Sequence, residues 1–358
     1  MSVAFHPLKI AEVVRETANA VSLSFVVPDD LADVFTFRPG QHLTLRADID
    51  GADVRRNYSL CVSPGEGRLR VAIKQVAGGA FSSWAMANLK PGATIEVMPP
   101  HGSFTADIAL DRPVHFAGFA CGSGITPILS LLKATLEVGA GNRFTLIYGN
   151  HDSSSVIFLE EIAQLKNRYM GRLEVYHFLS AEEEDVELFN GRLDRAKCDE
   201  ILSGLVDASG IDEFFICGPA PMMDAAEAAL KQAGVDQSAI HVERFTADRP
   251  DGAKAAELAT FSAKAAGLPM RITLDGRTRQ VQFDAQAGNI LESARAAGLS
   301  APFACKAGVC ATCRAKVVSG TVRMAARYGL TDAEIAAGYI LTCQSFPEGE
   351  GLVLDYDQ

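Results

Sequence analysis

Apolar and polar residues alternate in short runs through the first hundred residues of the chain. Five such runs, bounded by Gly, Pro or acidic residues, are VSLSFVVP, QHLTLRADID, RNYSLCV, RLRVAIKQV and TIEVMPP. Alternation with a period of two is typical of half-buried strands, and turn residues at regular spacing are typical of small all-β domains. Residues 1–106 are therefore predicted to form a small antiparallel β-barrel or β-sandwich, of which we take the β-barrel as the prediction.

From residue 107 the pattern changes to apolar strands that alternate with amphipathic helices. VHFAGFA precedes the helical stretch TPILSLLKATLEVG, and FTLIYGN precedes IFLEEIAQLKNRY. LEVYHFLS is followed, after a gap, by FFICGPAPMMDAAEAALKQAG. This alternation predicts a parallel, doubly wound α/β domain over residues 107–246.

A third pattern follows a stretch that has little to bury. Residues 247–268 are rich in alanine and poor in aromatic and β-branched residues, which predicts a linker that could also form a short helix. Residues 269–358 begin with a hairpin around Asp275-Gly276, and the helical stretch NILESARAAG ends at Gly298. We therefore expect three domains and a linker, the last domain being α+β.

Composition and charge narrow the possible functions. The 358 residues exceed one ordinary domain, and a formal net charge of -11 opposes binding to nucleic acids. No apolar run reaches the ~20 residues of a membrane span, and the amino end lacks the pattern of an export signal. We expect a soluble, cytoplasmic protein, in which the eight cysteines are not a disulfide framework.

Four cysteines near the carboxyl end have a spacing that points to an iron-sulfur cluster. They are Cys305, Cys310, Cys313 and Cys343. This C-x4-C-x2-C run with a distant fourth cysteine is the spacing of plant-type 2Fe-2S ferredoxins. Small residues between the cysteines let backbone N–H groups approach the sulfurs, and these are Ala307, Gly308, Ala311 and Thr312. A structural zinc site is the alternative, although zinc sites more often pair two C-x2-C knuckles.

Residues 269–358 resemble a plant-type ferredoxin with a β-grasp fold, and the two preceding domains resemble the ferredoxin-NADP reductase superfamily. Over its whole length the chain is similar to the reductase subunits of the bacterial phenylacetyl-CoA epoxidases, which are multicomponent oxygenases. The resemblance implies that NAD(P)H reduces FAD, FAD reduces the cluster, and the cluster reduces an oxygenase component, expected to be a di-iron epoxidase. Reductases of aromatic-ring or steroid hydroxylases share this domain order, so the partner stays open. A zinc-stapled module that senses redox state is a remote alternative.

FRPGQHLTL and RNYSL match the flavin-binding segment of that superfamily. The resemblance implies that Arg56 pairs with the pyrophosphate, that Tyr58 stacks on the isoalloxazine, and that Ser59 hydrogen-bonds near N5, where hydride arrives. KQVAGGAFSSW resembles the second phosphate loop, and it favours FAD over FMN; its residues are Gly78, Gly79, Ser82 and Ser83. Taken singly, each residue could instead serve a surface ion pair, a half-buried strand or a turn.

A second glycine-rich segment, AGFACGSGITP, follows a predicted strand and opens a predicted helix. This is the context of a phosphate-binding turn, in which Gly122 and Gly124 let the backbone approach a pyrophosphate. Thr126 is expected to cap the helix, and Pro127 to lie in its first turn. The resemblance also places Thr126 close to the nicotinamide.

Two later segments complete the expected site of hydride transfer. ICGPAP places Cys217, Gly218 and Pro219 at a strand end that the superfamily keeps beside the nicotinamide, although Cys217 could equally be a small buried residue. In HVERF, Phe245 matches the position of an aromatic residue near the flavin, two residues after Glu243, although both could instead be ordinary residues at a strand end. The candidate catalytic residues are Ser59, Cys217 and Glu243. Hydride transfer needs no general base, so the expected role of Cys217 is positioning.

The preference between NADH and NADPH stays open at this point. Relatives that use NADPH place Ser and Arg at the 2'-phosphate, and the matching segment keeps Ser180 but has Ala181 and then three acidic residues. Carboxylates near a phosphate favour NADH, and His151 stands where a basic residue is often found. Reductases of oxygenases, as a family, lean to NADPH.

Overall fold

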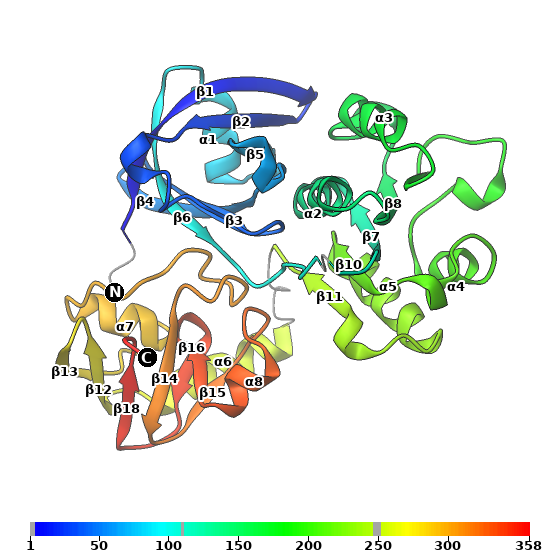
Figure 1. Ribbon diagram of the computed structural model, residues 1–358. Coiled ribbons are helices and arrows are strands. Elements are labelled where there is room, and N and C mark those ends of the chain that lie inside the picture. The colour runs from blue at the N-terminus through cyan, green and yellow to red at the C-terminus, as the bar shows by residue number, and fades with distance from the viewer. Residues whose placement is uncertain (1–3, 109–110, 246–251) are drawn as a thin grey trace. The chain divides into compact units, whose positions relative to one another are not determined.

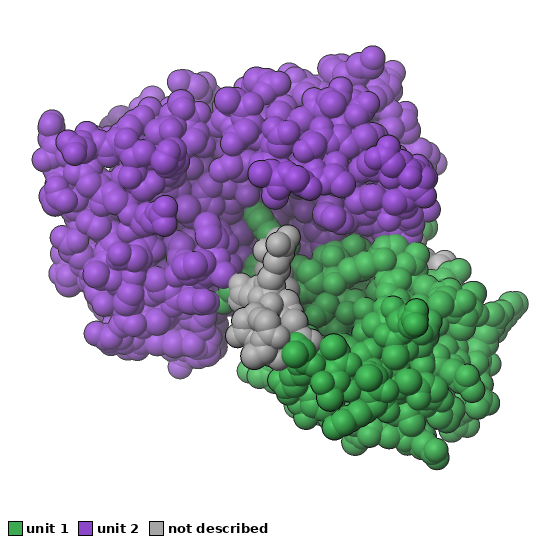
Figure 2. Space-filling view, turned by 180° about the vertical axis from the view of Figure 1, so that it is seen from behind, with its two compact units in different colours: residues 1–4, 244–358 green, residues 5–243 purple. Residues whose placement is uncertain are grey.

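The structure is a computed structural model that describes residues 4–108, 111–245 and 252–358 (Figure 1). The chain divides into two compact units, which are coloured separately in Figure 2. The N-terminal unit is Phe5–Glu243, and the C-terminal unit contains Arg244–Gln358.

Six antiparallel strands form the barrel of the N-terminal unit: β1 (His6–Thr17), β2 (Ala20–Val26), β3 (His42–Ile49), β4 (Ala52–Ser59), β5 (Leu69–Lys74) and β6 (Thr94–His101). Their order is β4-β3-β6-β1-β2-β5, and a bridge between Leu60 and Val71 joins the two ends. Helix α1 (Ala80–Asn88) packs Phe81 and Ala85 into the barrel core. The five predicted strands are confirmed. Strand β1 was not predicted, because most of its side chains are at least partly exposed and its alternation is weak.

Five parallel strands follow: β7 (His115–Cys121), β8 (Arg143–Asn150), β9 (Leu173–Leu179), β10 (Glu213–Cys217) and β11 (Ile240–Glu243). Their order is β11-β10-β7-β8-β9. The chain adds β8 and β9 on one side of β7 and then returns to add β10 and β11 on the other side, so the topological switch point lies between β7 and β10. Ligands bind at such a switch point, outside the carboxyl ends of the strands.

Helices cover both faces of this sheet, as the doubly wound prediction requires. Helices α2 (Ile125–Val138) and α3 (Leu159–Arg168) pack on one face, and α4 (Arg195–Gly204) and α5 (Ala220–Gln232) pack on the other. The core under α2 also includes Ala20, Cys61 and Ala72 of the barrel, so this core extends from the sheet into the barrel, which has a second core of its own.

The C-terminal unit is built on a five-stranded mixed sheet in the order β13-β12-β18-β14-β16. Its strands are β12 (Pro269–Leu274), β13 (Arg277–Gln282), β14 (Arg314–Ser319), β16 (Tyr339–Leu341) and β18 (Leu352–Asp355); β15 (Val322–Met324) and β17 (Ser345–Pro347) pair separately. Helices α7 (Ile290–Ala296) and α8 (Asp332–Ala336) complete it. The predicted hairpin is confirmed, with Asp275 and Gly276 at φ of 51° and 70°. The unit has the α+β, β-grasp arrangement that the resemblance implies.

The alanine-rich stretch, predicted to be a linker that could also form a short helix, contains helix α6 (Gly252–Lys264). Leu258, Ala265 and Leu268 pack against the core of the C-terminal unit. Residues 246–251 lie outside the described residues.

No helix in the described part of the chain is long and apolar enough to cross a membrane. All eight cysteines are free, as expected.

Candidate functional site

The four cysteines of the C-terminal unit lie as two pairs. The Cys305 thiol hydrogen-bonds to Cys310, and the Cys313 thiol hydrogen-bonds to Cys343. The bond from Cys305 lowers the pKa of Cys310 to about 5 in spite of burial, and the bond from Cys313 lowers the pKa of Cys343. Among the described residues, no three His, Cys, Asp or Glu side chains are gathered to hold one metal ion. Two pairs of thiols suit a cluster that contains two irons.

Further hydrogen-bond donors surround these sulfurs. The Ala307 amide lies 3.3 Å from the Cys305 sulfur, and the Cys305 amide lies 3.5 Å from the Cys310 sulfur. The Thr312 hydroxyl lies 3.3 Å from the same Cys310 sulfur. Donors to sulfur stabilise thiolates, so the loop suits the ligands of an iron-sulfur cluster.

The cysteine loop is closed by a segment that sequence reasoning missed. A Cβ on Gly329 would lie 2.8 Å from the Ala311 amide nitrogen, and a Cβ on Gly308 would lie 3.1 Å from the Ala326 carbonyl oxygen. The Gly329 amide also donates to the Gly308 carbonyl at 2.9 Å. The small residues in AARYG are the signal that could have identified this contact.

In the N-terminal unit, Arg56 is exposed near the end of β4. Its guanidinium donates to the Arg55 carbonyl at 2.7 Å, and within the described residues it makes no ion pair. The neighbouring Arg55 differs, because Asp53 pairs with it at 2.8 Å. Arg56 is thus the arginine available to an anion.

Tyr58 and Ser59 follow on the same strand. Tyr58 is half-buried with its ring centroid 5.7 Å from that of Phe81, and burial raises the pKa of its hydroxyl. Ser59 is buried and pairs in register with His42. The His42 Nε2 lies 3.0 Å from the His101 Nε2, and burial together with His101 lowers the pKa of His42 well below its usual range.

The predicted second phosphate loop begins α1. Gly78 has a φ of 70°, and Gly79 is the N-cap of the helix. The buried Ser82 hydroxyl accepts a hydrogen bond from the Val76 amide at 3.0 Å, so it closes the turn internally. The Ser83 hydroxyl accepts only a longer contact, at 3.5 Å, from Gln75. Of the two candidate serines, Ser83 is therefore the one whose hydroxyl makes the weaker hydrogen bond within the protein and could more readily bind a phosphate.

The nucleotide turn lies at the carboxyl end of β7. Gly122 has a φ of 54°, and a Cβ on Gly124 would clash with the Cys217 carbonyl. Pro127 lies in the first turn of α2, as predicted. The expected cap at Thr126 is wrong: Gly124 is the N-cap, and the buried Thr126 hydroxyl donates to the Ser123 carbonyl at 3.0 Å. A 3-10 turn over Gly122–Gly124 leads directly into α2, which places Thr126 inside the helix.

Cys217 and Glu243 are brought together as register partners on β10 and β11. Burial, with a smaller contribution from Glu243, raises the pKa of the Cys217 thiol well above its usual range. A Cβ on Gly218 would lie 2.9 Å from the Cys121 Cβ, and Pro219 is the N-cap of α5. Phe245 is 39% exposed and falls in the C-terminal unit, so its place beside the flavin stays a prediction.

Ser180 and Ala181 follow β9 and lie along the segment after β8. The Ser180 amide donates to the Asn150 carbonyl at 3.1 Å, and the Ala181 amide donates to the His151 carbonyl at 2.8 Å. The Glu182 carboxylate accepts from the Ser153 amide at 3.0 Å. The strand ends thus bring together the residues that bear on the choice between NADH and NADPH, which stays open.

Three family models match successive parts of the chain. They describe an oxidoreductase FAD-binding domain over residues 7–106, an oxidoreductase NAD-binding domain over 119–228, and a 2Fe-2S iron-sulfur cluster binding domain over 272–348. The chain is 41% identical to a component of the 1,2-phenylacetyl-CoA epoxidase of Escherichia coli K12, over 99% of this chain and 98% of that relative. The chain belongs to the family of FAD-, NAD- and 2Fe-2S-containing reductase components of oxygenases.

The reductase is also 35% identical to the ferredoxin reductase component of 3-ketosteroid-9-alpha-monooxygenase from Rhodococcus rhodochrous, over 98% of this chain and 96% of that relative. Its fold is that of phthalate dioxygenase reductase, with a TM-score of 0.61, 23% identity and 98% coverage of both chains. The predicted FAD, nicotinamide and 2Fe-2S domains are confirmed. The match to the 2Fe-2S model sets the zinc-stapled alternative aside.

Two cations near the nucleotide turn of the reductase were missed from the sequence. A Cβ on Gly122 would lie 3.2 Å from the Lys74 Nζ at the end of β5. Lys74 and Arg192 both act to lower the pKa of the Cys121 thiol, although burial outweighs them and raises it. A lysine that ends a strand in an acidic unit is the only signal, and the packing of β5 against this turn brings the lysine there.

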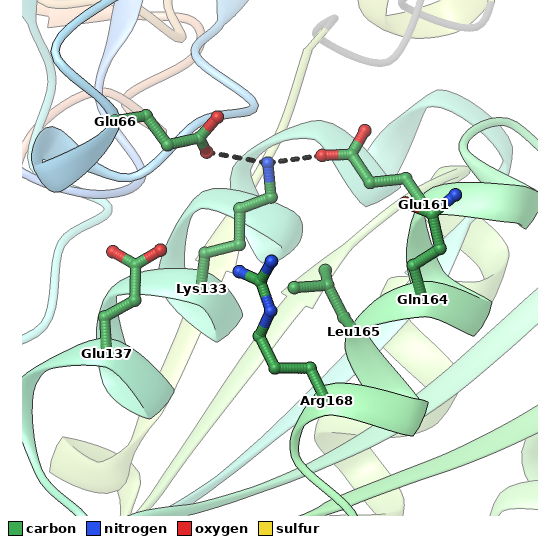
Figure 3. A pocket seen from close by; sticks show the side chains of 7 residues that line it. All are labelled: Glu66, Lys133, Glu137, Glu161, Gln164, Leu165 and Arg168. Carbon is green, nitrogen blue, oxygen red and sulfur yellow. Dashed lines mark hydrogen bonds and ion pairs between the residues drawn. The ribbon is translucent and has the colours of Figure 1, made fainter.

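Helix α2 of the reductase is anchored to the barrel by a buried charge. Figure 3 shows the Lys133 ammonium between the Glu66 and Glu161 carboxylates, 2.7 Å from the former. Lys133 is 3% exposed, and although burial opposes the shift, its ammonium holds the pKa of Glu66 below the usual range. One turn earlier, the Ser130 hydroxyl donates to the Val62 carbonyl at 2.6 Å. The nucleotide turn that opens α2 is thereby held in place relative to the barrel.

Proposed function

We propose that this reductase serves a phenylacetyl-CoA epoxidase and that its acceptor is the di-iron oxygenase component of that enzyme. The observation that supports the proposal is the 41% identity to the Escherichia coli relative, which extends over 99% of this chain. The domain limits proposed from the sequence, 1–106, 107–246 and 269–358, contain the three segments that the family models match.

In this proposal the two cysteine pairs, Cys305 with Cys310 and Cys313 with Cys343, would hold the two irons of the cluster. The amides of Cys305 and Ala307 point at sulfur, and they would stabilise the charge of the thiolates. When bound, FAD accepts a hydride from NAD(P)H and the 2Fe-2S cluster passes electrons singly to an acceptor.

The flavin is assigned to the exposed end of β4 and the start of α1. Arg56 pairs with the pyrophosphate through its planar guanidinium, which no carboxylate of the described residues occupies. Tyr58 stacks on the ring system and Ser59 hydrogen-bonds near its reactive nitrogen. Gly79 and Ser83 receive a phosphate at the N-terminus of α1.

The nicotinamide nucleotide is assigned to the carboxyl ends of β7 and β10. Gly122 and Gly124 carry no side chain that would block a pyrophosphate, and Lys74 adds a positive charge beside them. Cys217, with its pKa raised, stays a neutral thiol and packs beside the ring without attacking it. Glu243 borders the same position.

Reconstitution tests the proposed partner. The purified chain, NADPH or NADH, and the oxygenase component of the Escherichia coli phenylacetyl-CoA epoxidase should together convert phenylacetyl-CoA to its epoxide. A steroid hydroxylase is the second candidate, because the Rhodococcus relative is 35% identical over 98% of this chain. Equal or faster turnover with the oxygenase of the 3-ketosteroid enzyme would assign the chain to that class instead.

A further inference from the structure

The charges of the C-terminal unit are segregated along the chain. Residues 293–331 contain six Lys and Arg and no Asp or Glu. This run spans the cysteine loop, in a chain whose formal net charge is -11. By contrast, residues 1–243 contain 32 Asp and Glu against 20 Lys and Arg. The part of the chain around the predicted cluster is therefore the part in which cations dominate.

Two of these cations lie near the cysteine of the loop that comes closest to solvent. Cys305 is half-buried, whereas the other three cysteines of the loop are buried. Lys306 follows it directly, and Arg295 on α7 shares the Glu292 carboxylate with Lys306, at 3.0 Å and 2.8 Å respectively. Both cations also lie over the ring of Phe303, at 4.1 Å and 4.5 Å from its centroid.

The third cation is Arg327, in the segment that closes the loop. Its neighbour Ala326 contacts Gly308, and Arg327 itself is exposed. Within the described residues Arg327 makes no ion pair, whereas Arg314 pairs with Glu334, and Arg323 pairs with Glu348 at 3.1 Å. We call Arg295, Lys306 and Arg327 the cationic rim. Arg295 and Lys306 share one carboxylate, that of Glu292.

A rim of this kind suits the capture of a separate protein. Rim charges change association rates more than they change final affinity, and they matter most for short-lived encounters. Electron transfer within one chain has less need of such steering, because a covalent connection already supplies a high effective concentration. A positive rim attracts an acidic surface and repels a basic one.

We propose that the cationic rim is the docking surface for an acidic face of the acceptor protein. The inference deepens the proposed function and rests on it for the identity of that acceptor, the oxygenase component. Docking there would bring the acceptor next to the half-buried Cys305, the cluster cysteine nearest to solvent, and so would shorten the distance for electron transfer from the cluster.

Charge reversal tests the rim in the full-length protein. We expect Lys306→Glu with Arg327→Glu to lower kcat/KM for the oxygenase component about 10- to 100-fold at low ionic strength. The dissociation constant, measured by interferometry with immobilised oxygenase, should rise in parallel. Both differences should shrink as salt is added, because the screening length shortens. The matched control is Arg277→Glu with Arg279→Glu on β13, two exposed arginines far along the sequence from the loop, and it should behave like the wild type.

Cytochrome c, a basic haem protein, supplies a test that does not depend on the identity of the partner. Its reduction should become faster in the rim variant and stay unchanged in the control. An unaltered rate with cytochrome c, or equal losses in the rim and control variants, would overturn the proposal. So would a rim variant in which NADH reduces the cluster more slowly in rapid mixing without any acceptor, because the rim would then serve the acidic N-terminal unit. The wild-type chain could fail to drive the oxygenase component while the rim variant still reduces cytochrome c faster than the wild type does. That result would contradict the proposed function but not the docking role of the cationic rim.

Discussion

The cysteines of the two units differ in their surroundings. The pKa is lowered at Cys310 and Cys343 of the C-terminal unit, which accept hydrogen bonds from Cys305 and Cys313, whereas it is raised at all four cysteines of the N-terminal unit. Cys310 receives hydrogen bonds from a thiol, an amide and a hydroxyl, and its pKa is lowered to about 5. In the N-terminal unit, burial raises the pKa of Cys61 to about 11 and that of Cys198 to about 12. The difference lies in the number of donors that face each sulfur: Cys61 receives a hydrogen bond from the Arg70 guanidinium, whereas a thiol, an amide and a hydroxyl converge on Cys310, and donors that converge in this way stabilise a thiolate.

The two units also assemble their sites over different lengths of chain. Three of the cluster cysteines lie within nine residues, in a loop with left-handed backbone at Lys306, Gly308 and Ala311. The residues proposed to bind flavin and nucleotide run from Arg56 to Glu243, and strand pairing together with the packing of α2 on the barrel brings them into one unit. A local site should fail completely when one member is lost, and a distributed site should weaken in steps.

The largest effect is expected from Cys313→Ser. Loss of one thiolate should remove or badly weaken the cluster, and cytochrome c reduction should fall to background. Ferricyanide reduction should stay substantial, because the flavin can reduce it directly and the N-terminal unit keeps its own core. Cluster content is followed by visible absorption and by acid-labile sulfide.

Cys198→Ser is the matched control for that change, since it also replaces a fully buried cysteine. It should lower the free energy of unfolding by about 1 to 3 kcal/mol, the range for a buried hydroxyl with poor partners, and leave both electron-transfer rates intact. Equal loss of the cluster in both variants would mean that the two surroundings do not differ in function.

A smaller and graded effect is expected from Arg56→Ala. Removing a charge-assisted contact to the pyrophosphate should weaken FAD binding about 10- to 100-fold, as measured by flavin fluorescence on dilution, while the cluster spectrum survives. Arg55→Ala provides the comparison, because Arg55 is already paired with Asp53. Full retention of flavin in Arg56→Ala would contradict the assignment.

A tenfold effect is expected from Ala181→Arg. An added guanidinium beside Ser180 should raise the ratio of kcat/KM for NADPH over NADH by roughly 10-fold, which corresponds to about 1.4 kcal/mol from one partly exposed contact. Ala181→Gln, similar in reach but neutral, should change the ratio much less. If the arginine leaves the ratio unaltered, the 2'-phosphate is bound elsewhere, with Arg192 as the next residue to test.

The smallest effect concerns acid. Burial and His101 depress the pKa of His42 in the folded barrel, whereas the unfolded chain takes up a proton near the ordinary value of about 6.5. Protonation of His42 therefore favours the unfolded chain below that pKa. The free energy of unfolding should be unaffected by this group above pH 7 and should fall between pH 7 and pH 5, by up to about 1.4 kcal/mol per pH unit. Urea unfolding monitored by flavin release should show the decline. A His42→Asn variant that keeps the full slope would assign it to other groups.

The cysteine loop could be predicted from the sequence because its ligands, turns and small residues are contiguous. The barrel strands were predictable where one face is buried, whereas the mostly exposed β1 was missed for want of a clear alternation. Thr126 was misassigned because a 3-10 turn before the helix has no distinct sequence pattern. Lys74 comes to the nucleotide turn through tertiary packing, and no sequence pattern around Lys74 indicates such a contact.

The shared core under α2 has a consequence for how the molecule melts. Because Ala20, Cys61 and Ala72 of the barrel are buried in the same cluster as the residues of α2, unfolding of either lobe of the N-terminal unit would expose part of the core of the other, and we expect the two lobes to unfold together. Differential scanning calorimetry should resolve two cooperative transitions, although the family models match three domains. Gene fusions that exchange modules between reductases should therefore succeed at the boundary before residue 252 and fail at the one near residue 107.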